Sequence, residues 1–253
     1  MKISVIIPVF NQVKYIGQAI DSVIKQKGCE FECIVVDGGS TDGTVDILKK
    51  YSKKIYWKSE KDNGLSNAVN KGLKKATGDI ITFIGSDDYY ASDDVFLKVE
   101  KLFKNNPDWN CLNGNYNIVD PEGRKIQSYV IWYKQFLRNL PFQSLLIGIT
   151  NFIIQPSTFW RKQLMEKVGF LDENLKYCMD YDYWLRIIKK NKIAITNDRL
   201  VNYRIHPGSN RGSSYKKLFL EDELVIRKYF KNSFILFLHK IHNYLTIFVY
   251  DRI

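Results

Sequence analysis

The stretch Ile80-Ile81-Thr82-Phe83-Ile84-Gly85-Ser86-Asp87-Asp88 decides how the rest of this chain is interpreted. It begins with five almost uniformly apolar residues, a pattern typical of a strand buried on both faces of a parallel or mixed sheet. In such sheets, ligands bind at the carboxyl ends of the strands, which is where Asp87 and Asp88 follow. Two adjacent carboxylates repel each other unless a positive charge lies near them. A hard divalent cation that also holds phosphate oxygens supplies such a charge, so the stretch predicts a Mg²⁺ or Mn²⁺ site.

A helix start is the alternative interpretation of the same residues. Ser86 or Asp87 is suited to cap a helix, and acidic side chains stabilise the first turn. The stretch alone does not separate the two interpretations, so the rest of the chain has to decide between them.

Strand and helix patterns alternate on the N-terminal side of this stretch. Apolar runs predict strands at residues 3–7, 31–36 and 55–57, and apolar residues at helical spacing predict helices at residues 13–26, 45–48 and 66–76. This alternation implies right-handed crossovers and therefore an α/β fold in which helices cover a parallel sheet.

The pattern is less regular after Asp88. Helices are expected at residues 93–105, 163–168 and 181–190, and a late strand at residues 193–195. Two short segments, residues 111–113 and 117–119, are expected to pair across a turn. The sequence contains no internal repeat and no clean domain boundary.

The positive charge is concentrated in the second half of the chain. Residues 1–120 carry 16 Lys and Arg against 16 Asp and Glu, whereas residues 121–253 carry 22 against 11, which accounts for the net charge of +11. One interpretation is that the neutral first half holds a nucleotide site and the basic second half faces an anionic partner. The other is a generally basic surface without a partner. A nucleic-acid-binding module is disfavoured because no basic-aromatic motif is present, and we expect no nucleic acid partner.

The cysteine pattern favours free thiols. Cys29, Cys33, Cys111 and Cys178 form no CxxC pair, and no signal peptide precedes Ile3. A reducing, cytoplasmic location is therefore expected.

Residues able to bind a nucleotide follow the first three predicted strands. Phe10 could cover the face of a base, and Asp37 could accept a hydrogen bond from the N3–H of a uracil-like base. Asp62-Asn63-Gly64 is a turn after the third strand. The alternative for Asp37 is that it merely caps the helix that begins near Thr41. The sequence has neither a G-x-G-x-x-G turn nor a Gly-Lys-Ser/Thr loop, so the dinucleotide-binding and P-loop classes are excluded.

Six ordered segments between about Ile3 and Asn210 resemble family 2 glycosyltransferases with the GT-A fold: VIIPVFNQ, VVDGGSTDGT, EKDNGLSNAVNKGLKKATGD, FIGSDD, QPSTFWRKQLMEKVGFLDENLKYCMDYDYWLRI and YRIHPGSN. The resemblance is strongest to bacterial members that extend cell-surface polysaccharide repeat units. It implies a Rossmann-like, mostly parallel sheet flanked by helices. We expect a GT-A domain at residues 1–212, with a nucleotide-sugar-binding half at 1–120 and an acceptor-binding half at 121–212, followed by an amphipathic helical extension at 213–253.

The resemblance also implies roles for individual residues. The nucleotide-binding residues are expected to be Pro8, Phe10, Asn11, Asp37, Asp62, Gly64, Ser86 and Asp87; the metal ligands Asp87, Asp88 and His206; the acceptor-binding residues Gln155, Pro156, Asp182 and Trp184; and the diphosphate contacts Arg204 and Arg211. A structural role is the alternative for His206. The chain departs from the family pattern at Gly85, where an acid often stands.

Asp180 occupies the position of the family's general base. Met179 replaces the Glu that many members have before it. On a helix, Asp180 and Asp182 point about 200° apart, so only one of them can face the donor. The alternative is an acid-rich first helical turn without catalytic function.

The function implied by the resemblance is inverting transfer of a sugar from a nucleotide-diphosphate sugar, expected to be a UDP-sugar, with Mn²⁺ or Mg²⁺ as cofactor. The acceptor is expected to be a glycan or a lipid-linked acceptor in surface polysaccharide biosynthesis. A non-catalytic nucleotide-sugar-binding or scaffold protein on the same fold is the alternative. The sugar, the acceptor and the linkage are not specified by the sequence.

The C-terminal segment 234–250 is apolar except for a polar stripe that includes His239, Asn243 and Thr246. This pattern predicts a helix in the membrane interface, with basic residues just upstream for anionic headgroups, and hence a peripheral position on the inner face of the plasma membrane. Packing on the catalytic domain and a homodimer contact are the alternatives.

Overall fold

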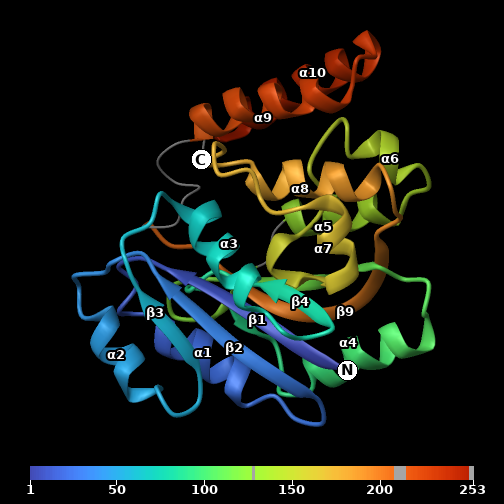
Figure 1. The fold of residues 1–253 in the computed structure, drawn as a ribbon. Coiled ribbons are helices and arrows are strands. Elements are labelled where there is room, and N and C mark those ends of the chain that lie inside the picture. Colours follow the sequence, from blue (N-terminus) through green and yellow to red (C-terminus); the bar gives the residue numbers. More distant parts are fainter. Residues whose placement is uncertain (127–128, 208–214, 251–253) are drawn as a thin grey trace.

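The computed structural model describes residues 1–126, 129–207 and 215–250. A mixed sheet with strand order β3-β2-β1-β4-β8-β6-β9-β5 runs through the molecule, and β7 pairs with β6 at its side (Figure 1). The strands are β1 (Lys2–Val9), β2 (Glu30–Asp37), β3 (Tyr56–Ser59), β4 (Ile80–Phe83), β5 (Tyr89–Tyr90), β6 (Cys111–Val119), β7 (Lys125–Ile126), β8 (Thr158–Arg161) and β9 (Ala194–Arg204). The helices are α1 (Ile16–Ile24), α2 (Thr44–Lys50), α3 (Leu65–Lys75), α4 (Val95–Asn105), α5 (Tyr129–Asn139), α6 (Gln143–Leu146), the 3₁₀ helix η1 (Gln155–Ser157), α7 (Lys162–Val168), α8 (Met179–Ile188), α9 (Tyr215–Tyr229) and α10 (Ser233–Tyr250).

The first half of the sheet is parallel, as the alternation of strand and helix patterns predicts. β1 pairs in parallel with both β2 and β4, and β2 pairs in parallel with β3. The register places Val9 opposite Asp37, and Asp37 opposite Ser59. The polar segments that follow these strands therefore begin at the same edge of the sheet.

The second half of the sheet is mixed. β8 is antiparallel to both β4 and β6, whereas β9 is parallel to β6 and antiparallel to the short strand β5. The prediction that residues 111–113 and 117–119 pair across a turn is wrong, because Cys111–Val119 is one continuous strand. Gly114 lies at the centre of that strand, where a Cβ would lie 2.3 Å from Leu200 Cδ1. The glycine thus provides room for the neighbouring strand β9 and does not form a turn.

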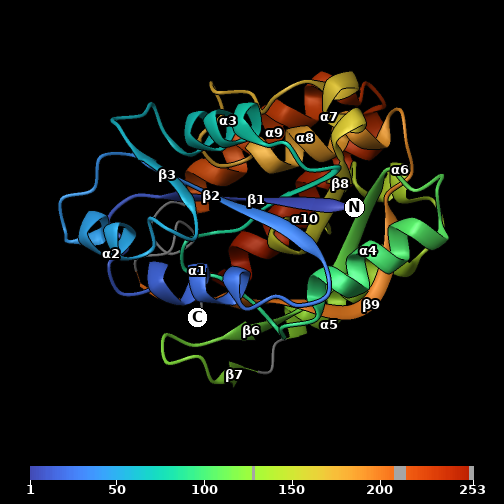
Figure 2. The same cartoon turned by 60° about the horizontal axis from the view of Figure 1, so that its bottom comes forward.

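Two apolar clusters lie on opposite faces of the sheet. Alternate residues of β1 divide between them, so that Val5 and Ile7 pack with α1 and α4 while Ile6 packs with α3. The cluster on the α3 side also contains α7 and α8 (Figures 1 and 2). There, Trp160 and Trp184 are fully buried with ring centroids 5.9 Å apart in an edge-to-face arrangement.

The C-terminal helices α9 and α10 form a layer beyond α8 (Figure 1). The polar stripe of α10 faces this layer's interior: His239 is 1% exposed and Asn243 is 9% exposed. The alternative prediction, that this helix packs on the catalytic domain, is therefore correct for the polar stripe. Among the described residues, no helix is long and apolar enough to cross a membrane. The four cysteines are free thiols, as the sequence predicts.

Candidate active site

The segments after β1 and β2 are joined by side-chain hydrogen bonds. The Asn11 amide donates to Ser40 Oγ (2.7 Å), and the Thr41 amide donates to Asn11 Oδ1 (2.9 Å). Asn11 has a φ of 51°, a left-handed conformation that asparagine tolerates better than most residues. The polar side chains after the two strands thus form one loop cluster, beside which Phe10 remains 60% exposed. Pro8 is buried within β1 and contributes no exposed surface to this cluster.

Asp37 is fully buried at the end of β2. Its Oδ2 accepts hydrogen bonds from the amides of Gly39 (3.1 Å) and Ser40 (3.0 Å) and from Ser59 Oγ (2.6 Å), and its Oδ1 accepts from Ser40 Oγ. The alternative prediction for Asp37 was a helix cap, but α2 begins later, at Thr44, whose amide donates to Asp42. Asp37 therefore shapes the loop at residues 38–40.

Asp62 lies against this loop. A Cβ at Gly38 would lie 2.5 Å from Asp62 Oδ2, so glycine at this position lets the Asp62 carboxylate lie directly against the loop. Asp62 Oδ1 accepts a hydrogen bond from the amide of Gly64 (2.8 Å), the residue that precedes α3. The structure thus brings together the expected nucleotide-binding residues Asp37 and Asp62, which come from neighbouring strands.

The acidic pair follows β4 in a tight turn. The Asp88 amide donates to Gly85 O (3.1 Å), and the next element is the strand β5, so the predicted alternative of a helix starting here is wrong. A Cβ at Gly85 would lie 2.6 Å from Asp87 Oδ1 and 3.0 Å from Asp88 Oδ2. Both carboxylates therefore converge on the space above Gly85. Ser86, one residue on, is buried.

Arg204, at the end of β9, is hydrogen-bonded to the acidic turn. Its backbone amide donates to Asp88 Oδ1 (2.9 Å), its Nε donates to Asp87 O (2.9 Å), and its Nη1 donates to the carbonyls of Asp120 and Pro121. Its guanidinium also lies 4.7 Å from the centre of the Tyr15 ring. Arg204 was expected to contact a diphosphate. Because it is 2% exposed and its donors are used within the protein, the structure assigns it a supporting position instead.

His206 reaches the same turn from the segment after β9. Its Nε2 lies 3.0 Å from Asp87 Oδ2, and its ring packs on Tyr15 with centroids 4.8 Å apart. Tyr15 belongs to the segment that links β1 to α1, so the residues after β1, β4 and β9 meet here. Sequence reasoning missed Tyr15, and its position just before a predicted helix gave no signal for it.

The Asp87 and His206 pair fits a divalent cation. Two ligands each about 2.1 Å from one ion lie roughly 3 Å apart when they are at right angles, and these two atoms are separated by 3.0 Å. Within residues 1–126, 129–207 and 215–250, no group of three or more His, Cys, Asp or Glu side chains is arranged to hold a metal. A cation here would therefore take further ligands from a diphosphate, as is usual for Mg²⁺ and Mn²⁺.

The expected acceptor residues separate into two groups. Gln155 lies beside the acidic turn, since its Nε2 donates to Phe83 O at the end of β4, and it is followed by the buried Pro156. Trp184 is fully buried in the core, and Asp182 is 3% exposed. The expectation that Trp184 and Asp182 line an acceptor pocket is therefore corrected, because α8 is covered on both of the sides to which they point: Trp184 packs on Trp160, and Asp182 bonds to Tyr229 of α9.

Among the described residues, both carboxylate oxygens of Asp182 have partners inside the protein. Its Oδ2 pairs with Arg186 Nε (3.0 Å), and its Oδ1 accepts from the hydroxyl of Tyr229 (2.7 Å) on α9. The Tyr229 hydroxyl has a pKa raised to a value above its usual range, first by burial and then by this hydrogen bond. Asp180, by contrast, is half-buried in the first turn of the same helix. Arg211, the other expected diphosphate contact, lies outside the described residues.

Glu221 of α9 caps the helix that carries Asp180. Its Oε1 accepts from the amides of Lys176 (3.0 Å), Tyr177 (2.8 Å) and Cys178 (2.9 Å), which immediately precede α8. Cys178 is the N-cap residue of α8 and the other two amides precede it, so the carboxylate fixes the segment that enters the helix and lies near the positive end of its dipole. No sequence pattern identified this cap, because the two segments are 43 to 45 residues apart.

A buried polar network lies beside the capped helix. The Asn243 amide donates to Asp222 Oδ2 (3.0 Å) and approaches His239 Nε2 (3.0 Å), while His239 Nδ1 approaches Ile149 O (3.0 Å). Burial raises the pKa of Asp222 to about 7, with a further contribution from the negative charge of Asp180. Burial also lowers the pKa of His239 below its usual value. The C-terminal helices are thus coupled electrostatically to the expected base.

Comparison with known proteins gives a consistent set of relatives. Residues 4–169 match the family described as Glycosyl transferase family 2. An uncharacterized glycosyltransferase of Rickettsia prowazekii is 27% identical over 249 residues, which cover 96% of this chain and 77% of that protein. WfgD of Escherichia coli, named UDP-Glc:alpha-D-GlcNAc-diphosphoundecaprenol beta-1,3-glucosyltransferase, is 27% identical over 223 residues, which cover 85% of this chain and 82% of that protein.

A solved structure agrees with these relatives. The crystal structure of S. aureus TarS 1-349 in complex with UDP-GlcNAc has a TM-score of 0.68 and 27% identity. The similarity covers 89% of this chain and 65% of that chain, so this chain spans slightly less than two thirds of the TarS structure. The expected α/β fold of the GT-A type is thereby confirmed.

Proposed function

Because this chain belongs to glycosyl transferase family 2, we propose that it is an inverting, metal-dependent enzyme that moves a sugar from a UDP-sugar to a hydroxyl group. We place the acceptor among glycans and lipid-linked intermediates of surface polysaccharide biosynthesis. The names of two relatives support this choice: WfgD is named for UDP-Glc and a diphosphoundecaprenol-linked acceptor, and TarS was solved with UDP-GlcNAc.

The observation that carries the proposal is the meeting of Asp87, Asp88 and His206 beside the loops after β1 and β2. Asp87 and His206 lie 3.0 Å apart, and Asp88 is held in place by the amide of Arg204. The exposed Phe10 and the partly buried Asp62 border the same edge of the sheet, where a uracil base and its ribose would bind. Asp37 supports this site by fixing the loop at residues 38–40.

In this proposal Asp87 and His206 would hold the metal together with diphosphate oxygens, while Asp88, whose Oδ1 accepts the amide of Arg204, adds negative charge beside them. A divalent cation bound there would neutralise the negative charge of the leaving diphosphate. Arg204 keeps the acidic turn in place, since it donates to the main chain of Asp87. The side chain of Gln155, bonded to Phe83 O, borders the space beyond this turn and is our candidate for an acceptor contact.

Asp180 acts as the general base in this proposal. Its carboxylate takes the proton of the acceptor hydroxyl as the oxygen attacks the anomeric carbon from the side opposite the diphosphate. A single displacement assisted by one base inverts the configuration of that carbon. Glu221 holds the first turn of α8, so it fixes the position from which Asp180 works.

Calorimetric titration with UDP and UDP-GlcNAc, with and without Mn²⁺, tests the donor site. We expect Mn²⁺ to strengthen nucleotide binding, and Asp87→Asn to remove this metal-dependent gain while the melting temperature is retained. Asp88→Asn should have the same effect on binding; asparagine is chosen because Asp88 accepts the buried amide of Arg204. Exposed Asp46 lies on α2, away from the acidic turn, so Asp46→Asn serves as the control. Unchanged nucleotide affinity in both site variants, with and without EDTA, would contradict the proposed donor site.

A further inference from the structure

Two helices on one side of the molecule turn their polar side chains inward. On α10, His239 and Asn243 are buried against Ile149 O and Asp222. On α5, Arg138 is 1% exposed, and its guanidinium donates to the carbonyls of Gly114 (2.6 Å) and Thr196 (2.7 Å). These three polar side chains are thus used inside the protein, whereas the polar face of a surface helix usually points to solvent.

The outward faces of these helices are apolar. The exposed apolar side chains of α10 are Phe234, Phe237, Ile241, Tyr244, Leu245 and Phe248, which are between 41% and 70% exposed. At about 100° per residue they fall within one arc on the side opposite His239 and Asn243. The exposed aromatic side chains of α5 are Tyr129, Trp132, Tyr133 and Phe136. We call these two sets together the outer face.

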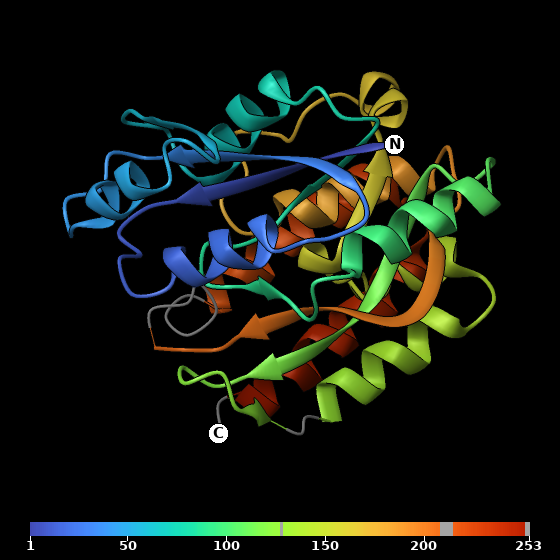
Figure 3. The ribbon, with the colours of Figure 1, turned by 90° about the horizontal axis from the view of Figure 1, so that it is seen from below.

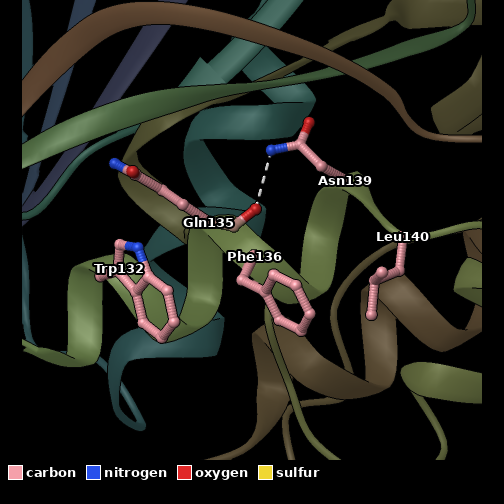
Figure 4. Close-up of a pocket in the computed structure, with 5 residues that line it drawn as sticks. All are labelled: Trp132, Gln135, Phe136, Asn139 and Leu140. Carbon is pink, nitrogen blue, oxygen red and sulfur yellow. Dashed lines mark hydrogen bonds between the residues drawn. The ribbon is translucent and has the colours of Figure 1, made fainter.

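The two parts of the outer face are contiguous. The rings of Tyr133 on α5 and His242 on α10 stack with centroids 6.0 Å apart, and α5 and α10 lie next to each other in the view from below (Figure 3). A shallow pocket of about 320 Å³ opens on α5 (Figure 4). It is lined by Trp132, Phe136 and Leu140 together with two amide side chains, and the rings of Trp132 and Phe136 stack within it. The outer face is therefore an extended surface rather than scattered single side chains.

The charges of this surface favour an anionic partner. Neither residues 129–139 nor residues 233–250 contain an Asp or a Glu. Two exposed basic side chains border the outer face: Lys240, which pairs with Glu223 of α9 (3.2 Å) beside its arc on α10, and Lys231, which precedes that helix. A two-fold dimer would bring these two acid-free helices and their bordering lysines against their own copies, since an isologous interface pairs each patch with itself. A lipid surface accepts aromatic and aliphatic side chains together with flanking lysines.

We infer that the outer face of α5 and α10 docks on the surface of an anionic lipid bilayer. In this arrangement α10 lies in the headgroup layer with Phe237, Tyr244 and Leu245 directed toward the acyl chains. The inference goes beyond the proposed sugar transfer, and it would hold for any acceptor. It keeps the expected interfacial position of α10 and adds that the polar stripe of this helix packs against the protein.

Vesicle flotation tests this inference with the whole chain. The wild type should float with vesicles of phosphatidylcholine mixed with phosphatidylglycerol and bind less well to phosphatidylcholine alone. The triple variant Phe237→Gln, Tyr244→Gln, Leu245→Gln should lower the partition coefficient at least about tenfold, because binding scales with buried apolar area. The control replaces two exposed aromatic residues elsewhere, Tyr56→Gln and Phe170→Gln, which are 43% and 40% exposed, and should float like the wild type.

The melting temperature of the triple variant and its affinity for UDP are measured in parallel. A failure of the docking inference can then be distinguished from a failure of the proposed transfer reaction. The triple variant should keep the wild-type melting temperature within a few degrees and its affinity for UDP, because the replaced side chains are exposed. Wild-type protein that stays at the bottom of the gradient with both vesicle types would overturn the inference. Equal flotation of the wild type and the triple variant would do so as well. A solution dimer that only the triple variant dissociates, without vesicle binding by either protein, would assign the outer face to a second copy.

Discussion

Arg204 accounts for how two adjacent carboxylates are tolerated at the end of β4. Asp87 and Asp88 need a positive charge nearby, and the buried guanidinium of Arg204 lies directly beneath their turn, 2.9 Å from Asp87 O. Its partners within the described chain are carbonyls, a glutamine and aromatic rings, so its charge is not cancelled by direct contact with a carboxylate. The guanidinium of Arg204 therefore supplies part of the positive charge that offsets the repulsion between Asp87 and Asp88. A bound cation would supply the remainder.

Asp180 and Asp182 are only two residues apart, yet they lie in different environments. We expect Asp180→Asn to lower the transfer rate by roughly two to four orders of magnitude, the usual contribution of a general base, while donor affinity stays unchanged.

We expect Asp182→Asn to lower stability by roughly 3 kcal/mol, because it removes the charge that pairs with Arg186 in a buried site. Single-turnover transfer and urea unfolding measure the two effects. A larger loss of transfer in folded Asp182→Asn than in Asp180→Asn would refute our assignment of the base.

At the scale of elements, α9 links the C-terminal layer to the beginning of α8 through two of its side chains. Glu221 caps the first turn of α8, and Tyr229 donates to Asp182, which also pairs with Arg186 near its last turn. A helix whose terminal N–H groups are capped is less prone to fray, so the expected base gains a fixed position. The C-terminal segment therefore belongs to the support of the catalytic side chains, although the family motifs in the sequence end before it.

Removing the cap should weaken both stability and turnover. We expect Glu221→Ala to cost about 1–2 kcal/mol of stability, as for the loss of a strong helix cap, and to lower kcat with little change in the KM for the donor. Glu221→Gln keeps one acceptor oxygen and should restore most of the turnover. Glu223→Ala on the same helix removes only partly exposed ion pairs with Arg227 and Lys240 and should cost less than about 1 kcal/mol. Equal kcat in Glu221→Ala and the wild type would limit Glu221 to a purely structural role.

At the scale of the whole molecule, the C-terminal layer carries a buried ionisable group that responds to pH. The groups facing Asp222 are Asn243 and His239 on α10, Asp180 on α8 and Lys134 on α5. Burial dominates and raises the pKa of Asp222 from 3.8 to about 7, so the folded protein binds its proton more tightly than the unfolded chain does. Unfolding then releases a proton, and the stability contributed by Asp222 falls as the pH rises from about 4 to about 7.

Asp222→Asn should remove this dependence because it keeps the shape of the side chain without the titration. The difference in melting temperature between Asp222→Asn and the wild type should shift in favour of the variant as the pH rises across that interval. Thermal melts of both proteins at successive pH values measure it, and taking the difference cancels the titration of other carboxyl groups such as Glu32, whose pKa is lowered to about 2. A difference that does not change with pH would show that Asp222 keeps an ordinary pKa.

The sequence by itself determined the N-terminal sheet and the place of the acidic turn. The predicted strands and helices of residues 1–105 agree with β1–β4 and α1–α4, whereas the short strand β5 was not predicted. The central strands are apolar runs buried on both faces, and the helices carry apolar residues at helical spacing, so both patterns repeat within a few residues. The six motifs identified the family, which the comparisons confirm.

Only the tertiary structure decided which face of each C-terminal helix packs on the protein. It also decided which residues support the site. The apolar pattern of α10 indicates two faces but does not say which one meets the protein; His239 and Asn243 turn inward because Asp222 and Ile149 O are there to pair with them. The same holds for Glu221 and Arg204, whose partners are up to 186 residues away in the chain. Local periodicity specifies an element, whereas the partner of a buried polar group is set by the packing of distant segments.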